Sequence, residues 1–161
     1  MRQLKLLTRF MDNIERRVIS LLFIEVVVVG TMQVIWRFLL KASLSWSEEL
    51  LRYSFVWITF LAASVAVPVD GHVNVGLLIK KLKGNKKKSI IILNYIICFI
   101  FSVCILFLAI KILNVLFVTG QKSAAMQIPM YILYLAIALS FFSMTFKYVV
   151  KIYDSIYENV N

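Results

Sequence analysis

The sequence predicts an all-α integral membrane protein of four transmembrane helices, with short amphipathic helices at the membrane interface. Sixty-one per cent of its 161 residues are hydrophobic, compared with the roughly 45–50% that is usual in soluble domains. The apolar residues gather in four blocks, each near the ~20 residues that a helix needs to cross a bilayer. The spaces between the blocks are too short for a soluble domain. We therefore expect one membrane domain over residues 1–161, with spans at about 18–40, 46–67, 89–118 and 129–151.

The placement of the basic residues predicts the orientation. Five Lys or Arg residues precede the first span, and six lie between the second and third spans, whereas the other two connections hold few. By the positive-inside rule, we expect the N-terminus, the 2–3 connection and the C-terminus on the cytoplasmic side. A net charge of +10 placed in this way favours membrane lipids as partners and gives no reason to expect nucleic acid. The expected lipid anchors of the 2–3 connection are Lys80, Lys81, Lys83, Lys86, Lys87 and Lys88.

Residues 1–17 have the pattern of an amphipathic helix. Apolar residues recur at steps of three and four, while charged residues take the other faces. We expect this helix to lie on the inner leaflet before the chain turns into the bilayer. The alternative is that it simply extends the first span. The apolar positions are Leu4, Leu7, Met11, Ile14 and Val18.

The first span contains an acidic residue, Glu25, roughly 10 Å from its start. Ionisable residues inside a membrane are costly and often functional, so Glu25 is a candidate proton- or cation-binding group. The alternative is an interhelical hydrogen bond or salt bridge, either to Arg17 or to a partner subunit. Gln33 and Arg37 lie on the same flank of the helix. Because the span has no second carboxylate at this depth, we favour the structural role.

The start of the second span carries a polar cluster. Ser45 and Glu48 match the S-x-x-E pattern of a capping box, in which the two side chains bond the first free backbone N–H groups. Glu48 and Glu49 also place negative charge at the positive end of the helix dipole. Arg52 follows at four and three residues and is expected to pair with either acid.

The rest of the chain offers little chemistry. The second span continues through Trp57 and small residues that allow close packing. His72 is the single histidine, and with Asp70 nearby it makes a poor zinc site, which needs three or four suitable ligands. Beyond the residues at span ends, Lys111 is the only ionisable residue expected inside the last three spans, and it should reach the interface. No motif of an enzyme is present, so we expect neither catalytic residues nor a cofactor.

One motif is more specific. Trp46-Ser47-Glu48-Glu49-Leu50-Leu51-Arg52-Tyr53, followed by Asp70-Gly71-His72-Val73-Asn74-Val75, resembles the small membrane subunit of tripartite ATP-independent periplasmic (TRAP) transporters. The later Ser123-Ala124-Ala125-Met126-Gln127-Ile128-Pro129 resembles the same family, although Gly76 and Met130 depart from its usual residues. The candidate partner or structural contacts are Glu25, Arg37, Trp46, Glu48, Glu49, Arg52, Trp57, Asp70 and His72.

The resemblance implies a non-catalytic scaffold subunit in a bacterial inner membrane. Its partners would be a large polytopic membrane subunit, which binds sodium ions and moves the substrate, and a periplasmic substrate-binding protein. The substrate would be an organic acid anion, either a C4-dicarboxylate or a sialic acid. The alternative function is a self-sufficient small exporter, acting as a homodimer with Glu25 as its proton-coupled carboxylate. A third is an assembly or regulatory membrane protein.

Overall fold

The computed structural model describes residues 2–41, 44–68 and 85–157. Within these ranges the chain forms four helices, which are α1 (Arg2–Leu40), α2 (Ser45–Ala66), α4 (Asn85–Thr119) and α5 (Tyr131–Tyr157). Each is long and apolar enough to cross a membrane. The predicted all-α membrane fold is therefore confirmed, and each helix overlaps one of the four expected spans.

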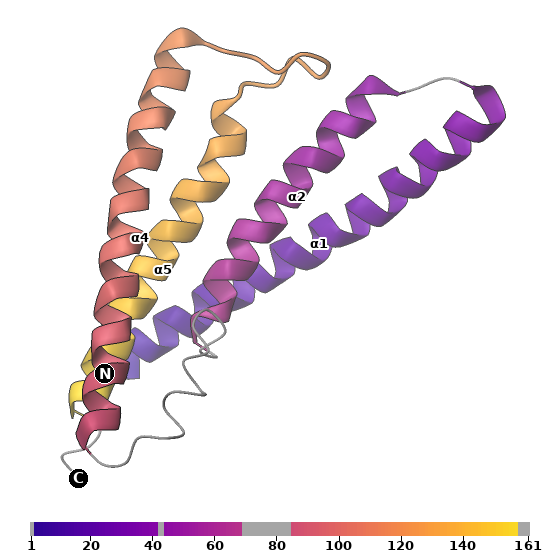
Figure 1. Cartoon of the computed structure of the whole chain (residues 1–161). Coiled ribbons are helices and arrows are strands. Elements are labelled where there is room, and N and C mark those ends of the chain that lie inside the picture. The colour runs from indigo at the N-terminus through magenta and orange to yellow at the C-terminus, as the bar shows by residue number, and fades with distance from the viewer. Residues whose placement is uncertain (1, 42–43, 69–84, 158–161) are drawn as a thin grey trace.

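The helices form two hairpins arranged as a V (Figure 1). Helix α1 pairs with α2, and α4 pairs with α5, while α2 and α5 provide most of the packing between the hairpins. The hairpins meet where α1 begins and where α2 and α5 end, which we call the closed end. They diverge toward the opposite, open end, where the connection from α4 to α5 reaches toward the start of α2 (Figure 1).

Helix α1 is continuous over 39 residues, about 58 Å at the usual rise. The expected turn between residues 1–17 and the first span is absent, because neither proline nor glycine interrupts the helix before Gly30. The apolar and charged residues of this segment differ in their exposure. Leu4, Leu7 and Ile14 are exposed, whereas the acidic Glu15 is buried against the other helices.

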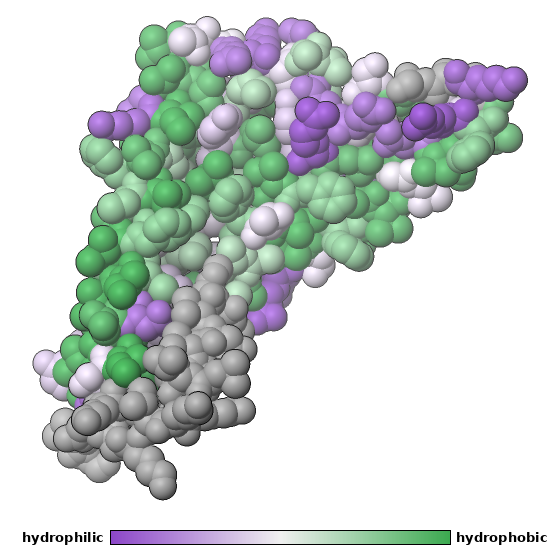
Figure 2. Space-filling model, viewed as in Figure 1, coloured by the Kyte–Doolittle hydropathy of each residue, from purple (hydrophilic) through white to green (hydrophobic). Residues whose placement is uncertain are grey.

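Small residues let α5 pack closely in the bundle. Ala136 and Ser140 are fully buried, and Ser143 is nearly so. Such residues allow helix backbones to approach closely. Helices α4 and α5 form the most extensive pair. Most large apolar side chains remain exposed, as suits helices that face lipid, and Figure 2 shows apolar residues over much of the visible face. The same view shows hydrophilic residues gathered at the open end.

The connection between α4 and α5 is a compact loop. Gly120 begins it with φ of 61°, a backbone conformation that glycine adopts without steric cost. The N–H of Ser123 donates to the Ile128 carbonyl at 2.8 Å, and the N–H of Met130 donates to the Gln121 carbonyl at 2.9 Å. These bonds fix the loop that reaches α2.

Candidate functional site

A buried ionic cluster joins three helices at the closed end. Lys147 of α5 is only 2% exposed. Its Nζ lies 2.6 Å from Asp12 Oδ1 and 2.6 Å from Glu15 Oε2, both on α1. It also donates to the Ser64 hydroxyl at 2.9 Å and to the Ser64 carbonyl at 3.1 Å, on α2. The Ser64 hydroxyl in turn donates to Glu15 Oε1 at 2.9 Å.

We call Asp12, Glu15, Ser64 and Lys147 the Lys147 cluster. Its other three residues compensate the positive charge of Lys147, which would otherwise be costly to bury. A buried ammonium group is tolerated only where opposite charges and hydrogen bonds compensate it. Lys147 has two carboxylates and two further oxygen acceptors around it. The cluster thereby links α1, α2 and α5 at one point.

The sequence pattern did not predict this cluster. The expectation that Lys111 is the only interior ionisable residue of the last three spans is wrong, because Lys147 is buried as well. Residues Ala136, Ser140, Ser143 and Lys147 follow one another at steps of four, three and four, so they share one helix face. The position of this lysine on the same helix face as three small residues was the available indication that it is buried. By itself, it did not reveal the acidic partners on α1.

A second polar contact lies at the open end, between α2 and the α4–α5 loop. Glu49 on α2 accepts hydrogen bonds through Oε2 from the N–H groups of Ala125, at 2.9 Å, and Met126, at 2.7 Å. Its Oε1 accepts the Tyr53 hydroxyl at 2.5 Å, and the Tyr53 oxygen lies 3.6 Å from the sulfur of Met130. Hydrogen bonds from backbone N–H groups to a carboxylate are charge-assisted and strong. We call this contact the Glu49 tie, and it fastens α2 to the α4–α5 loop.

The expected capping box is wrong. Leu44 is the N-cap of α2 and its side chain makes no capping hydrogen bond, so Ser45 is already inside the helix. Glu48 instead accepts a long hydrogen bond of 3.4 Å from Gln33 on α1. Ser45 is the first residue of the helix and not its N-cap, and the two acids contact other elements instead of their own backbone. Arg52 is exposed, and within the described residues it forms no ion pair with either acid.

Glu25 has no partner within the part of the chain that the structure describes. Both of its carboxylate oxygens are buried and neither has a hydrogen-bond partner there. Arg17 is exposed, and the described residues show no salt bridge between it and Glu25. The pairing with Arg17 is therefore not found.

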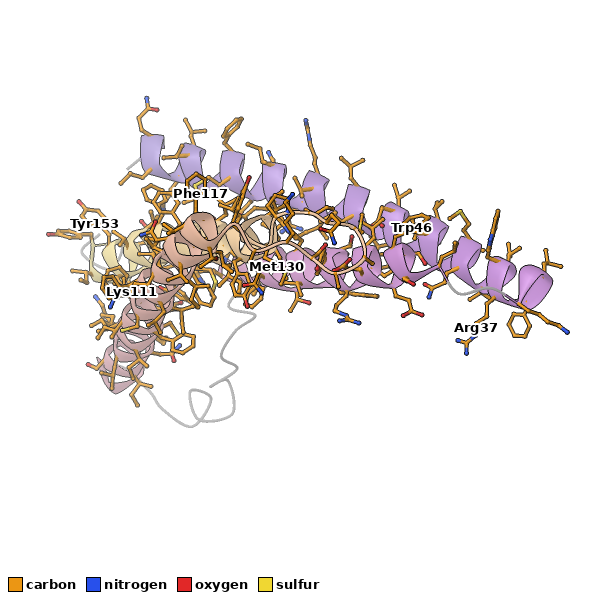
Figure 3. All side chains as sticks on the ribbon, turned by 90° about the horizontal axis from the view of Figure 1, so that it is seen from above. Arg37, Trp46, Lys111, Phe117, Met130 and Tyr153 are labelled. Carbon is orange, nitrogen blue, oxygen red and sulfur yellow. The ribbon has the colours of Figure 1, made fainter. Side chains whose placement is uncertain are left out.

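The other predicted residues within the described ranges are dispersed. Arg37 and Trp46 are exposed, and Arg37 points away from the helices at the open end (Figure 3). Lys111 is exposed, with its Nζ 4.6 Å from the centre of the Phe107 ring. Trp57 lines an almost wholly apolar, partly open cavity of about 340 Å³ between side chains of α1, α2, α5 and the α4–α5 loop.

Several predicted residues lie outside the described residues. These are Asp70 and His72, together with the lysines at 80, 81 and 83, and the structure describes no side chain for Lys86 or Lys87. Lys88 is described, and its Nζ donates to the carbonyl of Ile156 at 3.4 Å. In residues 2–41, 44–68 and 85–157, no group of three or more His, Cys, Asp or Glu side chains is placed to hold a metal ion.

Three relatives have sequences similar to this chain. The isethionate TRAP transporter permease protein DctMQ of Oleidesulfovibrio alaskensis is 26% identical over 137 residues, which is 80% of this chain and 21% of the relative. The sialic acid TRAP transporter small permease protein SiaQ of Vibrio cholerae is 30% identical over 90 residues, 56% of this chain and 52% of the relative. The C4-dicarboxylate TRAP transporter small permease protein DctQ of Rhodobacter capsulatus is 27% identical over 106 residues, 66% of this chain and 47% of the relative.

The chain thus spans about half the length of the two small permease proteins that it matches, and about a fifth of the DctMQ protein. The family model for the DctQ component of tripartite ATP-independent periplasmic transporters matches residues 26–157. That match includes the Trp46–Tyr53 motif and covers most of the chain. The protein is a multi-pass membrane protein that belongs to the family of DctQ components, the small permease subunits of TRAP transporters, as the resemblance predicted.

Proposed function

We propose that this chain is the non-transporting scaffold subunit of a sodium-coupled TRAP transporter in a bacterial inner membrane, with both termini in the cytoplasm. The observation that carries the proposal is that its polar contacts join helices to each other. The Lys147 cluster holds α1, α2 and α5 at the closed end, and the Glu49 tie holds α2 to the α4–α5 loop at the open end. Because these contacts hold helices together at both ends of the bundle, we expect the bundle to stay rigid while the large subunit moves beside it.

The backbone supports the same role. Substrate sites in secondary transporters usually involve helices broken near the middle of the membrane. The described residues with positive φ are Lys41, Gly120 and Gln127, and all three lie in connections between helices. The apolar cavity beside Trp57 offers almost no polar group that would recognise an organic anion. A substrate site is therefore better placed in another subunit.

The names of the relatives support the class of substrate that we propose. They are named for the transport of isethionate, sialic acid and C4-dicarboxylates, each of which is an organic acid anion at neutral pH. We propose that a large polytopic membrane subunit binds sodium ions and an anion of the dicarboxylate or sialic acid class. A periplasmic binding protein would deliver the anion, and this chain would need no cofactor. Substrate choice would then lie with those two partners.

The test is reconstitution with and without the large subunit. The purified chain alone should give no saturable uptake of sialic acid or C4-dicarboxylates, with or without a sodium gradient. Copurification from native membranes should recover a large polytopic partner. Gradient-driven uptake by this chain alone, or recovery only as a homodimer, would overturn the scaffold function.

The exporter alternative rests on one specific observation, the buried and unpartnered carboxylate of Glu25. A proton-coupled exporter would use this group directly, so Glu25→Gln should abolish proton-driven efflux by the chain alone. A scaffold requires no such efflux from the unmodified chain. The two functions therefore differ in whether the chain acts without a partner.

A further inference from the structure

Helix α4 has one face packed in the bundle and an opposite face that no described helix covers. Ser102, Ala109 and Leu116 are buried and recur every seven residues, so they share the packed face. Of the described helices, only α5 packs extensively against α4. Lys111 lies about 140–180° around the helix from these three residues, and it is on the side of α4 that is turned away from α2 (Figure 3).

The surface around Lys111 is exposed over several turns of α4. We call Lys111 and its neighbours on this side of the helix the Lys111 face. The neighbours, all of them exposed, are Cys104, Phe107, Leu108, Asn114, Val115 and Val118. Most of these side chains are apolar, as expected of a helix that meets lipid or another helix inside a membrane.

Lys111 and Asn114 are exceptions on this face. They lie three residues apart, so they are neighbours on the helix surface. Lys111 precedes Thr119, the last residue of α4, by eight residues, which is about 12 Å along the axis. Its Nζ lies 4.6 Å from the centre of the Phe107 ring, one turn nearer the middle of the helix. The ammonium group is therefore turned away from the end of α4, where headgroups and water would solvate it.

The described residues provide no acidic partner for Lys111. It forms no ion pair with any of their carboxylates. The acids outside the described residues are Asp70 and Glu158, which follow α2 and α5 in sequence, and both of these helices end at the closed end. Lys88 contacts that end of α5, and it lies 23 residues, about 35 Å along α4, from Lys111. The positions of these acids favour a carboxylate from outside the chain.

The pattern favours a protein helix over lipid on this face. Ionisable side chains within membrane spans almost always face the interior of a helix bundle and pair there. Asparagine side chains form hydrogen bonds between membrane helices. Because Lys111 and Asn114 face outward from this chain, the interior that they face belongs to a larger assembly. A lipid phosphate would require Lys111 to extend toward Thr119, which is opposite to the direction that its side chain takes.

We propose that the Lys111 face docks a transmembrane helix of the large membrane subunit, and that this helix carries an aspartate or glutamate. Its carboxylate accepts hydrogen bonds from Lys111 and Asn114, while the exposed apolar side chains of Leu108 and Val115 pack beside it. A charge-assisted hydrogen bond of this kind fixes the position of the partner helix along α4. The inference rests on the proposed function, because the partner is the large subunit of the transporter.

The first measurement is copurification of the large subunit with the full chain from native membranes. Lys111→Met retains the length of the side chain but strands the partner's carboxylate, so recovery of the large subunit should fall about tenfold. Lys111→Arg keeps the charge and should retain most of the recovery. Lys122→Met is the matched control, since Lys122 is an exposed lysine in the α4–α5 loop. Thermal unfolding of the isolated chain should be the same in Lys111→Met and Lys122→Met.

The second measurement identifies the carboxylate. Dicyclohexylcarbodiimide enters membranes and couples an amine to an adjacent carboxylate as an amide, while it takes up the lost oxygen and becomes the urea. In the complex it should join Lys111 to an acidic residue in a membrane span of the large subunit, which mass spectrometry of the joined peptides locates. The product should disappear in Lys111→Met and persist in Lys122→Met.

The outcomes distinguish this inference from the proposed function. If the unmodified chain recovers no large subunit, the proposed function fails and this inference fails with it. If the large subunit is recovered equally with Lys111→Met and Lys122→Met, this inference alone is overturned, and lipid covers the face. A coupled product between two copies of the chain would also overturn it, because the face would then be a contact within a homodimer.

Discussion

The ammonium nitrogen of Lys147 lies 2.6 Å from a carboxylate oxygen of Glu15, across 132 positions of sequence. This pair joins the fourth helix of the structure to the first. Asp12 approaches the same nitrogen at the same distance, and Ser64 connects the pair to α2. The point where the two hairpins meet is therefore a buried ionic contact.

Replacing Lys147 by Met should strongly destabilise the protein. The change keeps the length of the side chain but leaves two carboxylates without their cation, and stranding a buried charge costs about 3–5 kcal/mol. Thermal unfolding of the chain in detergent measures the effect. Lys111→Met is the matched control, since Lys111 is exposed and should tolerate the change. Equal melting temperatures for the two variants would show that the cluster contributes nothing to stability.

Neutralising the acids should rescue that variant. In Lys147→Met combined with Asp12→Asn and Glu15→Gln, no carboxylate of the cluster remains charged, so much of the lost stability should return. The comparison is between the triple variant and Lys147→Met alone. If the triple variant melts at the same or a lower temperature, loss of packing and not stranded charge explains the single variant.

Glu49→Gln should loosen the loop at the open end. Glutamine keeps the shape but replaces charge-assisted hydrogen bonds to Ala125 and Met126, each worth about 1.5–3 kcal/mol, by weaker neutral ones. Amide hydrogen exchange at these two residues should accelerate, while exchange in the middle of α5 stays slow. Glu48→Gln is the matched control, because Glu48 is exposed and, among the described residues, its side chain hydrogen-bonds only the Gln33 side chain, at 3.4 Å. Unchanged exchange in Glu49→Gln would contradict a restraining role for the tie.

Arg52→Leu tests whether Arg52 stabilises this chain itself or contacts a partner subunit. Arg52 is exposed and forms no ion pair with a described residue, so the stability of the isolated chain should change by only about 0–1 kcal/mol. Recovery of the large subunit in copurification should nevertheless fall, if the motif faces that subunit. Full recovery would place Arg52 outside the interface.

Glu25→Gln should leave coupling intact in the assembled transporter. The sequence offers no second carboxylate at the depth of Glu25, so we expect a packing role and not an ion site. Uptake by vesicles that contain the complete complex should stay sodium-dependent, with lower activity at most. Complete loss of transport by a normally assembled complex would make Glu25 a coupling residue.

The sequence by itself determined the helices and the family. Length and hydropathy were sufficient for the four helices, because a span of about 20 apolar residues has few alternatives in a membrane. The motifs at residues 46–53, 70–75 and 123–129 predicted the family, which the match over residues 26–157 confirms. The continuity of α1 was also foreseeable, since no residue before Gly30 breaks a helix.

The tertiary structure decided which polar residues meet. Glu48 and Glu49 are neighbours in the motif, yet one bonds Gln33 of α1 and the other bonds the α4–α5 loop, because successive residues of a helix point about 100° apart. Lys147 could be placed on a buried face by its spacing, but its partners lie more than a hundred positions away. Periodicity specifies which face of a helix is turned inward. Only the packing of α1, α2 and α5 around one another determines which charge that face encounters.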